Sequence, residues 1–196
     1  MWHCALQRRH RTPAEPTHGP TPTPRTMQPN AALIATMLGD TRYDAEAYMR
    51  EHVQPGEVIE IYGNNVYLPR FPEGAVVHRI DSRPTDNRNP MLDVIEKEDQ
   101  YGNVLARSPR WIVLSSGYFW RFLPRDPRST EGGHVLPESQ RILLADSDAT
   151  THMRSLFSQT AGYRVAHIFH YAGHPLLPPR AIHASLACDV WIFERQ

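Results

Sequence analysis

The segment from residue 39 to residue 62 constrains the fold most, because it holds a complete helix-to-strand unit. Asp40 or Thr41 can cap a helix there, and acidic side chains fill its first turns, where the helix dipole favours them. Four residues recur at helical spacing and predict the buried face of this helix: Ala45, Tyr48, Met49 and His52. Pro55-Gly56 ends the helix, and residues 57–62 then alternate like a strand with one buried face. We therefore expect a layered domain built from helices and strands.

The rest of the sequence continues this alternation. We expect further strands at residues 75–80, 110–115, 163–171 and 189–194, and helices at residues 90–99, 137–145 and 148–159, the last capped by Asp148. Residues 110–115 are the most apolar run, which predicts a central strand buried on both faces. The expected fold is a single α/β layered domain over residues 38–196, with a mixed sheet of about five strands, flanking helices and an antiparallel C-terminal strand pair.

The N-terminal region has a different composition. Residues 12–30 consist of Pro, Thr and polar residues, so we expect residues 1–30 to be disordered. Basic residues follow the short apolar part of the first eleven residues, which does not match a secretory signal. No run approaches the roughly 20 apolar residues that a transmembrane helix needs. The chain is expected to be soluble as written.

The charge balance argues against binding to nucleic acid. Lys+Arg and Asp+Glu both number 21, so the formal net charge is zero and no general attraction to a polyanion is expected. The two cysteines, Cys4 and Cys188, lie at opposite ends of the chain, and we expect no disulfide between them.

Five segments carry a family resemblance through their order and spacing: residues 39–59, Arg110–Tyr118, Met153–Phe157, Gly162–Phe169 and Val190–Arg195. Together they resemble the C-terminal extracytoplasmic soluble domain of bacterial multi-span glycosyltransferases that depend on a lipid carrier, the protein-mannosyltransferase-like superfamily. In that family a membrane span precedes the helix that here starts at Asp40. Residues 31–38 are all that could correspond to the end of that span.

The resemblance implies a role in sugar transfer from a polyprenyl-phosphate carrier at the outer face of the bacterial inner membrane. The family's catalytic acidic residues lie in loops between its membrane helices, and no position here matches them. The implied role is therefore that of an accessory domain without a cofactor and without catalysis of its own. It would pack on a membrane-embedded glycosyltransferase body, which this chain does not contain, and help to position a glycan or a lipid-linked sugar.

A rival interpretation uses Asp146 and Asp148. An apolar segment that ends in Asp-x-Asp is how nucleotide-sugar glycosyltransferases hold a divalent metal, so the chain could be a free-standing, metal-dependent enzyme. The alternative is that the preceding residues end one helix and Asp148 caps the next. No nucleotide-binding loop precedes the motif, which favours the capping role.

Aromatic residues suggest a third function, that of a small glycan-binding module. Five residues could line a sugar-binding surface, since aromatic faces stack on sugar rings and Arg donates forked hydrogen bonds: Tyr62, Tyr67, Tyr118, Trp120 and Arg121. Packing in the core and loops is the competing explanation for these aromatic residues.

Histidines and serines supply two weaker patterns. Four histidines invite a metal site, namely His167, His170, His174 and His183, but residues three apart on a strand point to opposite faces. We therefore expect surface or structural roles for them. Ser115-Ser116-Gly117 follows the central strand but lacks the motif of a nucleophilic serine, so a polar turn is expected.

Arg42 stands in the first turn of the helix predicted to start at Asp40 or Thr41, where the helix dipole disfavours positive charge. We expect Arg42 to pair with an acidic group, the nearest being Glu46, four residues on, or to face the membrane body that the resemblance implies.

Overall fold

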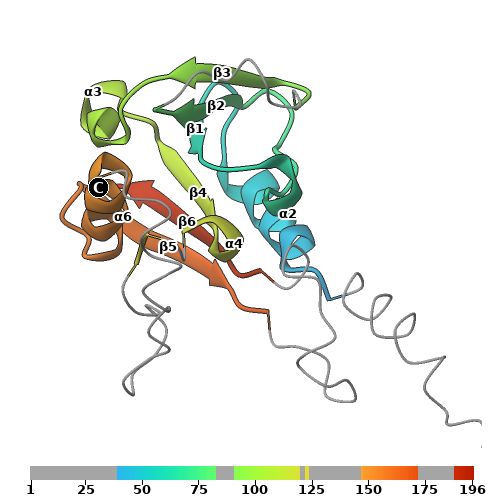
Figure 1. The fold of residues 1–196 in the computed structure, drawn as a ribbon. Coiled ribbons are helices and arrows are strands. Elements are labelled where there is room, and N and C mark those ends of the chain that lie inside the picture. The colour runs from blue at the N-terminus through green and yellow to red at the C-terminus, as the bar shows by residue number, and fades with distance from the viewer. Residues whose placement is uncertain (1–38, 83–90, 120–121, 124–146, 172–187) are drawn as a thin grey trace, which may run out of the picture.

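Figure 1 shows the computed structural model of the chain, which describes residues 39–82, 91–119, 122–123, 147–171 and 188–196. Six strands form one sheet in the order β3-β2-β1-β4-β6-β5. The strands are β1 (Val58–Ile61), β2 (Val76–Asp81), β3 (Val94–Glu98), β4 (Trp111–Ser115), β5 (Tyr163–Phe169) and β6 (Val190–Arg195). The helices are α2 (Thr41–His52), α3 (Val104–Arg107), α4 (Ser116–Phe119) and α6 (Ser147–Phe157), with 3₁₀ turns η1 (Asn65–Tyr67) and η2 (Tyr101–Asn103).

The sheet has a parallel half and an antiparallel half. β3, β2, β1 and β4 run parallel, whereas β6 runs antiparallel to both of its neighbours, β4 and β5. The predicted α/β fold is therefore confirmed, including the mixed sheet and the antiparallel C-terminal pair at one edge. The strand that the sequence does not predict is β3.

The prediction of a helix over residues 90–99 is wrong, because β3 lies in that segment. Asp93 has a φ of 62°, a left-handed conformation that does not continue a helix. The β-branched side chains of Val94 and Ile95 then favour extended backbone. Leu92 is 87% exposed and Ile95 is 50% exposed, so neither faces the core as a helix would require.

Two cores lie on the two faces of the sheet, each covered by a helix (Figure 1). Successive residues of a strand point to opposite faces, and Ile112 belongs to one core while Val113 belongs to the other. α2 packs on the Val113 side through Met49, and α6 packs on the Ile112 side through Met153. All residues of β4 are buried, which confirms it as the central strand that the apolar run predicts.

α2 begins at the predicted cap. The Asp40 side chain accepts a hydrogen bond from the backbone N–H two residues on, at 3.1 Å. The predicted buried face is confirmed for Ala45 and Met49, which have no exposed surface. Tyr48 is only partly buried and His52 is exposed, so the apolar stripe of α2 is narrower than the sequence predicts.

Arg42 pairs with an acidic group as predicted, but the partner is Asp40 and not Glu46. The Nε of Arg42 lies 2.9 Å from each carboxylate oxygen of Asp40, and its Nη1 donates to the carbonyl of Val66 at 2.6 Å. The N-cap carboxylate is beside Arg42, while the Glu46 carboxylate accepts the backbone N–H of Arg70 at 3.0 Å. That Arg42 faces a membrane body stays a prediction.

Three predictions lie outside the described residues: the disorder of residues 1–30, the nature of residues 31–38 and the helix over residues 137–145. Within the described ranges, every helix is too short or too polar to cross a membrane.

Candidate functional site

The strand order reverses between β1 and β4, and open α/β sheets commonly bind ligands at such a point, beyond the carboxyl ends of the strands. β1 continues into Tyr62 and Gly63 there, and β4 continues into α4 at Ser116 and Gly117. This end of the sheet is therefore the first place to look for a site.

Two tyrosine rings fill the space at this reversal point. Gly63 has a φ of 92°, and a Cβ added to it would lie 2.5 Å from the ring of Tyr118. A Cβ on Gly117 would lie 2.5 Å from the ring of Tyr67 and 2.8 Å from the Sγ of Cys188. Each glycine thus receives a side chain from another segment, and these rings occupy the place where a ligand would sit.

Hydrogen bonds join the remaining segments at this end. Ser116 donates its backbone N–H to the carbonyl of Asp189 at 2.8 Å, and the Asp189 N–H donates to the Ser116 hydroxyl at 2.9 Å. The Thr41 hydroxyl donates to the carbonyl of Cys188, and burial raises the pKa of the Cys188 thiol. Ser115 ends β4 and Ser116 begins α4, and both are buried, so a four-residue helix stands where the sequence predicts a polar turn.

The structure places the predicted sugar-binding aromatics in the packing of this end. Tyr62 has no exposed surface, and Tyr118 is buried with its hydroxyl 3.1 Å from that of Tyr101. Tyr67 is partly exposed and packs on Gly117. Trp120 and Arg121 lie outside the described residues.

A buried polar network lies on the α6 side of the sheet. Glu60 has no exposed surface, and Arg107 donates to its two oxygens from Nη2 at 2.7 Å and from Nε at 2.8 Å. Arg107 also donates from Nη1 to Asp99 at 2.7 Å. The Tyr62 hydroxyl donates to Glu60 as well. His152 Nε2 lies 2.8 Å from the Tyr62 oxygen, and it donates its proton there because the hydroxyl proton is used by Glu60.

The environment fixes the charge states of this network. Burial and the nearby Arg107 lower the pKa of His152 to about 3, so His152 is neutral at physiological pH. Burial and the Glu60 carboxylate raise the pKa of Tyr62 well above its usual value. Burial alone would lower the pKa of Arg107, but the hydrogen bonds to Glu60 and Asp99 raise it. These groups neither gain nor lose protons near neutral pH, so the network suits a structural role.

Asp148 also has a structural use, and it lies in the first turn of α6, which begins at Ser147, one residue before the predicted start. Its carboxylate accepts the backbone N–H groups of Tyr101 at 2.5 Å and Gly102 at 3.0 Å, which start the η2 turn. The first N–H groups of a 3₁₀ turn have no acceptor within the turn itself. The carboxylate of Asp148, on α6, accepts their hydrogen bonds. Asp146 lies outside the described residues. In the described part of the chain, no three His, Cys, Asp or Glu side chains are grouped so as to hold a metal ion.

His167 and His170 lie on opposite faces of the sheet. His167 stacks on Tyr48 of α2 with ring centroids 5.0 Å apart, whereas the His170 ring contacts Trp191, which belongs to the other core. The His170 Nδ1 lies 3.4 Å from the Asp189 carboxylate. The structure therefore does not bring these two histidines together, while His174 and His183 lie outside the described residues.

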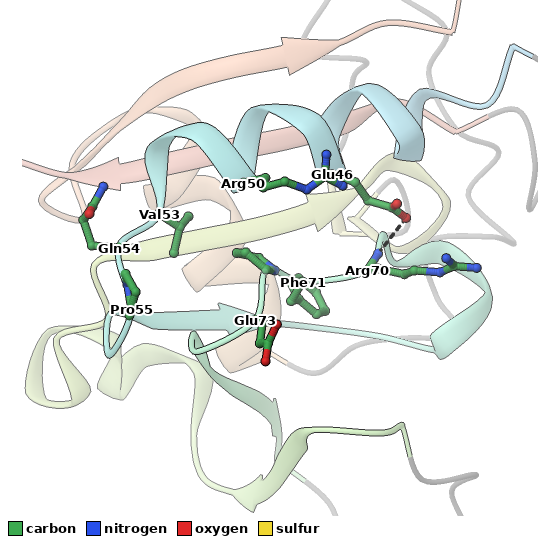
Figure 2. Close-up of a pocket in the computed structure, with 9 residues that line it drawn as sticks. Glu46, Arg50, Val53, Gln54, Pro55, Arg70, Phe71 and Glu73 are labelled. Atoms are coloured by element: carbon green, nitrogen blue, oxygen red, sulfur yellow. Dashed lines mark hydrogen bonds between the residues drawn. The ribbon is translucent and has the colours of Figure 1, made fainter.

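A pocket of about 530 Å³ opens between the C-terminal half of α2 and residues 70–73 (Figure 2). Figure 2 shows Glu46 and Arg50 on α2 beside the segment that carries Arg70, Phe71 and Glu73, with the hydrogen bond from the Arg70 N–H to Glu46 as a dashed line. A second hollow, of about 670 Å³, shares residues 70–73 as a wall and is lined by apolar side chains of residues 75, 77, 91 and 92.

The charged side chains of the first pocket keep hydrogen-bonding capacity. Among the described residues, the guanidinium groups of Arg50 and Arg70 and the carboxylate of Glu73 form no hydrogen bond or ion pair. This pocket is not predicted from the sequence. Glu46 and Arg50 are spaced to share one helix face, but nothing in the sequence places residues 70–73 against that face.

No protein-family model matches the chain, and a search of curated proteins finds no significant match. The resemblance to the tail of lipid-carrier-dependent glycosyltransferases therefore stays a prediction.

Proposed function

We propose that this domain is a non-catalytic accessory domain of a membrane-embedded glycosyltransferase that uses a lipid-linked sugar, and that it docks through the end of the sheet where α2 begins. The segments that carry the sequence resemblance support this proposal, because they form α2, β1, β4, α6, β5 and β6 of one domain. A resemblance spread over isolated loops would carry less weight.

The observation that carries the docking role is the surface around Arg42. Arg42 binds the cap residue Asp40 and the carbonyl of Val66, which ties the start of α2 to the loop after β1. Tyr43 and Val66 are 55% and 54% exposed on either side of this link. A membrane body joined before Asp40, as in the resembled family, would meet this end of the sheet first. Exposed apolar groups on a rigid support suit a protein interface.

Site-specific photo-crosslinking tests the docking role. Benzoylphenylalanine would replace Tyr43 in one variant and Leu105 in a control, and the full chain would be irradiated with membranes of its source organism. Leu105 is 61% exposed and lies against Gly162, at the opposite end of the sheet. We expect position 43, and not position 105, to capture a multi-span glycosyltransferase identified by mass spectrometry. Capture of other proteins alone, or equal yield at both positions, would contradict the proposal.

The rival metal-dependent function makes a separate prediction. If Asp146 and Asp148 hold a divalent metal, calorimetric titration with manganese and nucleotide diphosphate sugars should give binding that Asp146→Asn abolishes. The accessory role predicts no such metal-dependent binding. The engagement of Asp148 with the N–H groups of Tyr101 and Gly102 favours the accessory role.

A further inference from the structure

We infer that the pocket between α2 and residues 70–73 binds a neutral, hydroxyl-rich sugar ring. Phe71 would provide the stacking surface, and Glu46, Arg50, Arg70 and Glu73 would hydrogen-bond the hydroxyl groups. This site is separate from the predicted aromatics at the reversal point and from the docking surface around Arg42, and it does not depend on the docking role.

The size and walls of the pocket suit a small ligand. Its volume of about 530 Å³ falls in the usual range for small-molecule sites, about 300–1,000 Å³. The Gly56 N–H donates to the carbonyl of Gly74 at 2.8 Å, so the turn after α2 is bonded to the segment that carries the loop wall. The Arg70 N–H donates to Glu46 at 3.0 Å and joins that wall to α2 itself. The walls are therefore held in place before any ligand arrives, which lowers the cost of binding.

The chemistry of the lining selects the ligand class. Carboxylates only accept hydrogen bonds and guanidinium groups only donate them, whereas a hydroxyl group does both. Sugar hydroxyl groups can therefore donate to the carboxylates of the lining and accept from its guanidinium groups. A strongly anionic ligand would meet Glu46 and Glu73, a cationic ligand would meet the two arginines, and an apolar ligand would strip water from four charges. A neutral polyol avoids each of these costs.

Phe71 adds the apolar contact that sugar recognition needs. It lines both hollows and packs, partly buried, against the α2-side core. The C–H face of a pyranose ring is apolar and can lie against an aromatic ring, while its hydroxyl groups point outward to the polar lining. The second hollow shares Phe71, Arg70 and Glu73 but lacks the α2 side chains Glu46 and Arg50.

Nuclear magnetic resonance titration of the full chain tests the site. The probes are the methyl pyranosides of glucose, galactose and mannose, with glucuronate and glucosamine as charged comparisons. We expect at least one neutral glycoside to give saturable shifts at the amides of residues 46–54 and 70–73, and to bind more tightly than its charged relatives. Absence of saturable shifts with all three neutral glycosides, or shifts confined to other residues, would overturn the inference.

Variants of the lining residues distinguish a loss of sugar binding from a loss of folding and from a loss of docking. Arg50→Ala and Glu73→Gln should each weaken binding about tenfold, since each removes a hydrogen bond to a charged group. Arg154→Ala is the matched control, because Arg154 is exposed on α6 on the other face of the sheet. Phe71→Leu should also weaken binding, with thermal melts to check that the variant folds. Unchanged binding in both Arg50→Ala and Glu73→Gln would overturn the inference, whereas loss of crosslinking at position 43 would count only against docking.

Discussion

In the network below α6, Glu60 is buried and paired with Arg107, whereas most of the charged groups around the pocket beside α2 stand exposed. Glu60 and Arg107 meet in the interior and satisfy one another, and Tyr62 and His152 complete their hydrogen bonds. Around the pocket, Arg50 and Glu73 form no such pairs with other described residues. The two regions contain similar residue types in opposite states.

This contrast shows how a set of residues that resembles an active site can be part of the framework. Glutamate, arginine, histidine and tyrosine within hydrogen-bonding distance are typical of catalytic centres. In this network, however, Tyr62, Arg107 and His152 are each held in one charge state, and their hydrogen bonds are used inside the protein. Capacity to bind something else is found where hydrogen bonds are still unmade, and that is the pocket beside α2.

The largest expected effect comes from breaking the buried ion pair. Arg107→Ala leaves the Glu60 carboxylate in the interior without its cation, and such a loss costs about 3–5 kcal/mol of folding free energy. Urea unfolding followed by circular dichroism measures the change. Arg154→Ala, an exposed control, should change stability by less than about 0.5 kcal/mol. If Arg107→Ala also costs less than about 1 kcal/mol, the α6-side network does not support the fold and the comparison fails.

The α2 face should depend on apolar packing instead. Met49 is fully buried, so Met49→Ala should cost about 3 kcal/mol through lost packing and a cavity. Tyr48 is partly buried and stacks on His52 and His167, with centroids 3.9 Å and 5.0 Å apart. Tyr48→Ala should therefore cost less, about 1–2 kcal/mol. Denaturant melts of both variants test which substitution lowers the free energy of unfolding more. A larger decrease for Tyr48→Ala would show that Tyr48, and not Met49, is at the centre of the core on this face.

Local signals explain why much of the fold can be predicted from the sequence. Asp40 as a cap, Pro55-Gly56 as a stop and the apolar run of β4 act through nearby residues, and the structure confirms all three. β3 is different. It is an edge strand whose extended form depends on pairing with β2. The Asn-Pro pair before it is typical of a helix start and therefore predicts a helix instead.

The sites depend on contacts between segments that are distant in the sequence, and this is why the sequence predicts them poorly. Arg107 reaches Glu60 from 47 residues away, so the buried pair leaves no local pattern. Tyr118 is an aromatic residue after a central strand, but its burial follows from the close approach to Gly63. The pocket likewise exists only because residues 70–73 lie beside α2.

A smaller effect should appear when the pH is lowered. The pKa of His152 is about 3 in the folded state and about 6.5 when unfolded, so the unfolded state binds more protons between these values. The stabilisation is fully present above about pH 7 and falls as the pH drops, by about 2 kcal/mol between pH 7.5 and pH 5. Other groups titrate too, so the parent is compared with His152→Gln, whose amide can still donate to Tyr62. Urea melts should show a steeper acid loss for the parent; equal losses would mean that His152 is protonated in the fold.

The smallest effect on stability should come from the pocket. Arg50→Ala and Glu73→Ala each remove an exposed charge without a partner among the described residues, so each should change the free energy of unfolding by less than about 0.5 kcal/mol. The same kind of change at Arg107 is expected to be many times larger because that guanidinium neutralises a buried carboxylate. Urea unfolding at neutral pH measures both on one scale. A loss above about 1 kcal/mol at Arg50 would mean that the fold already uses its charge, and the distinction between the buried network and the pocket would no longer hold.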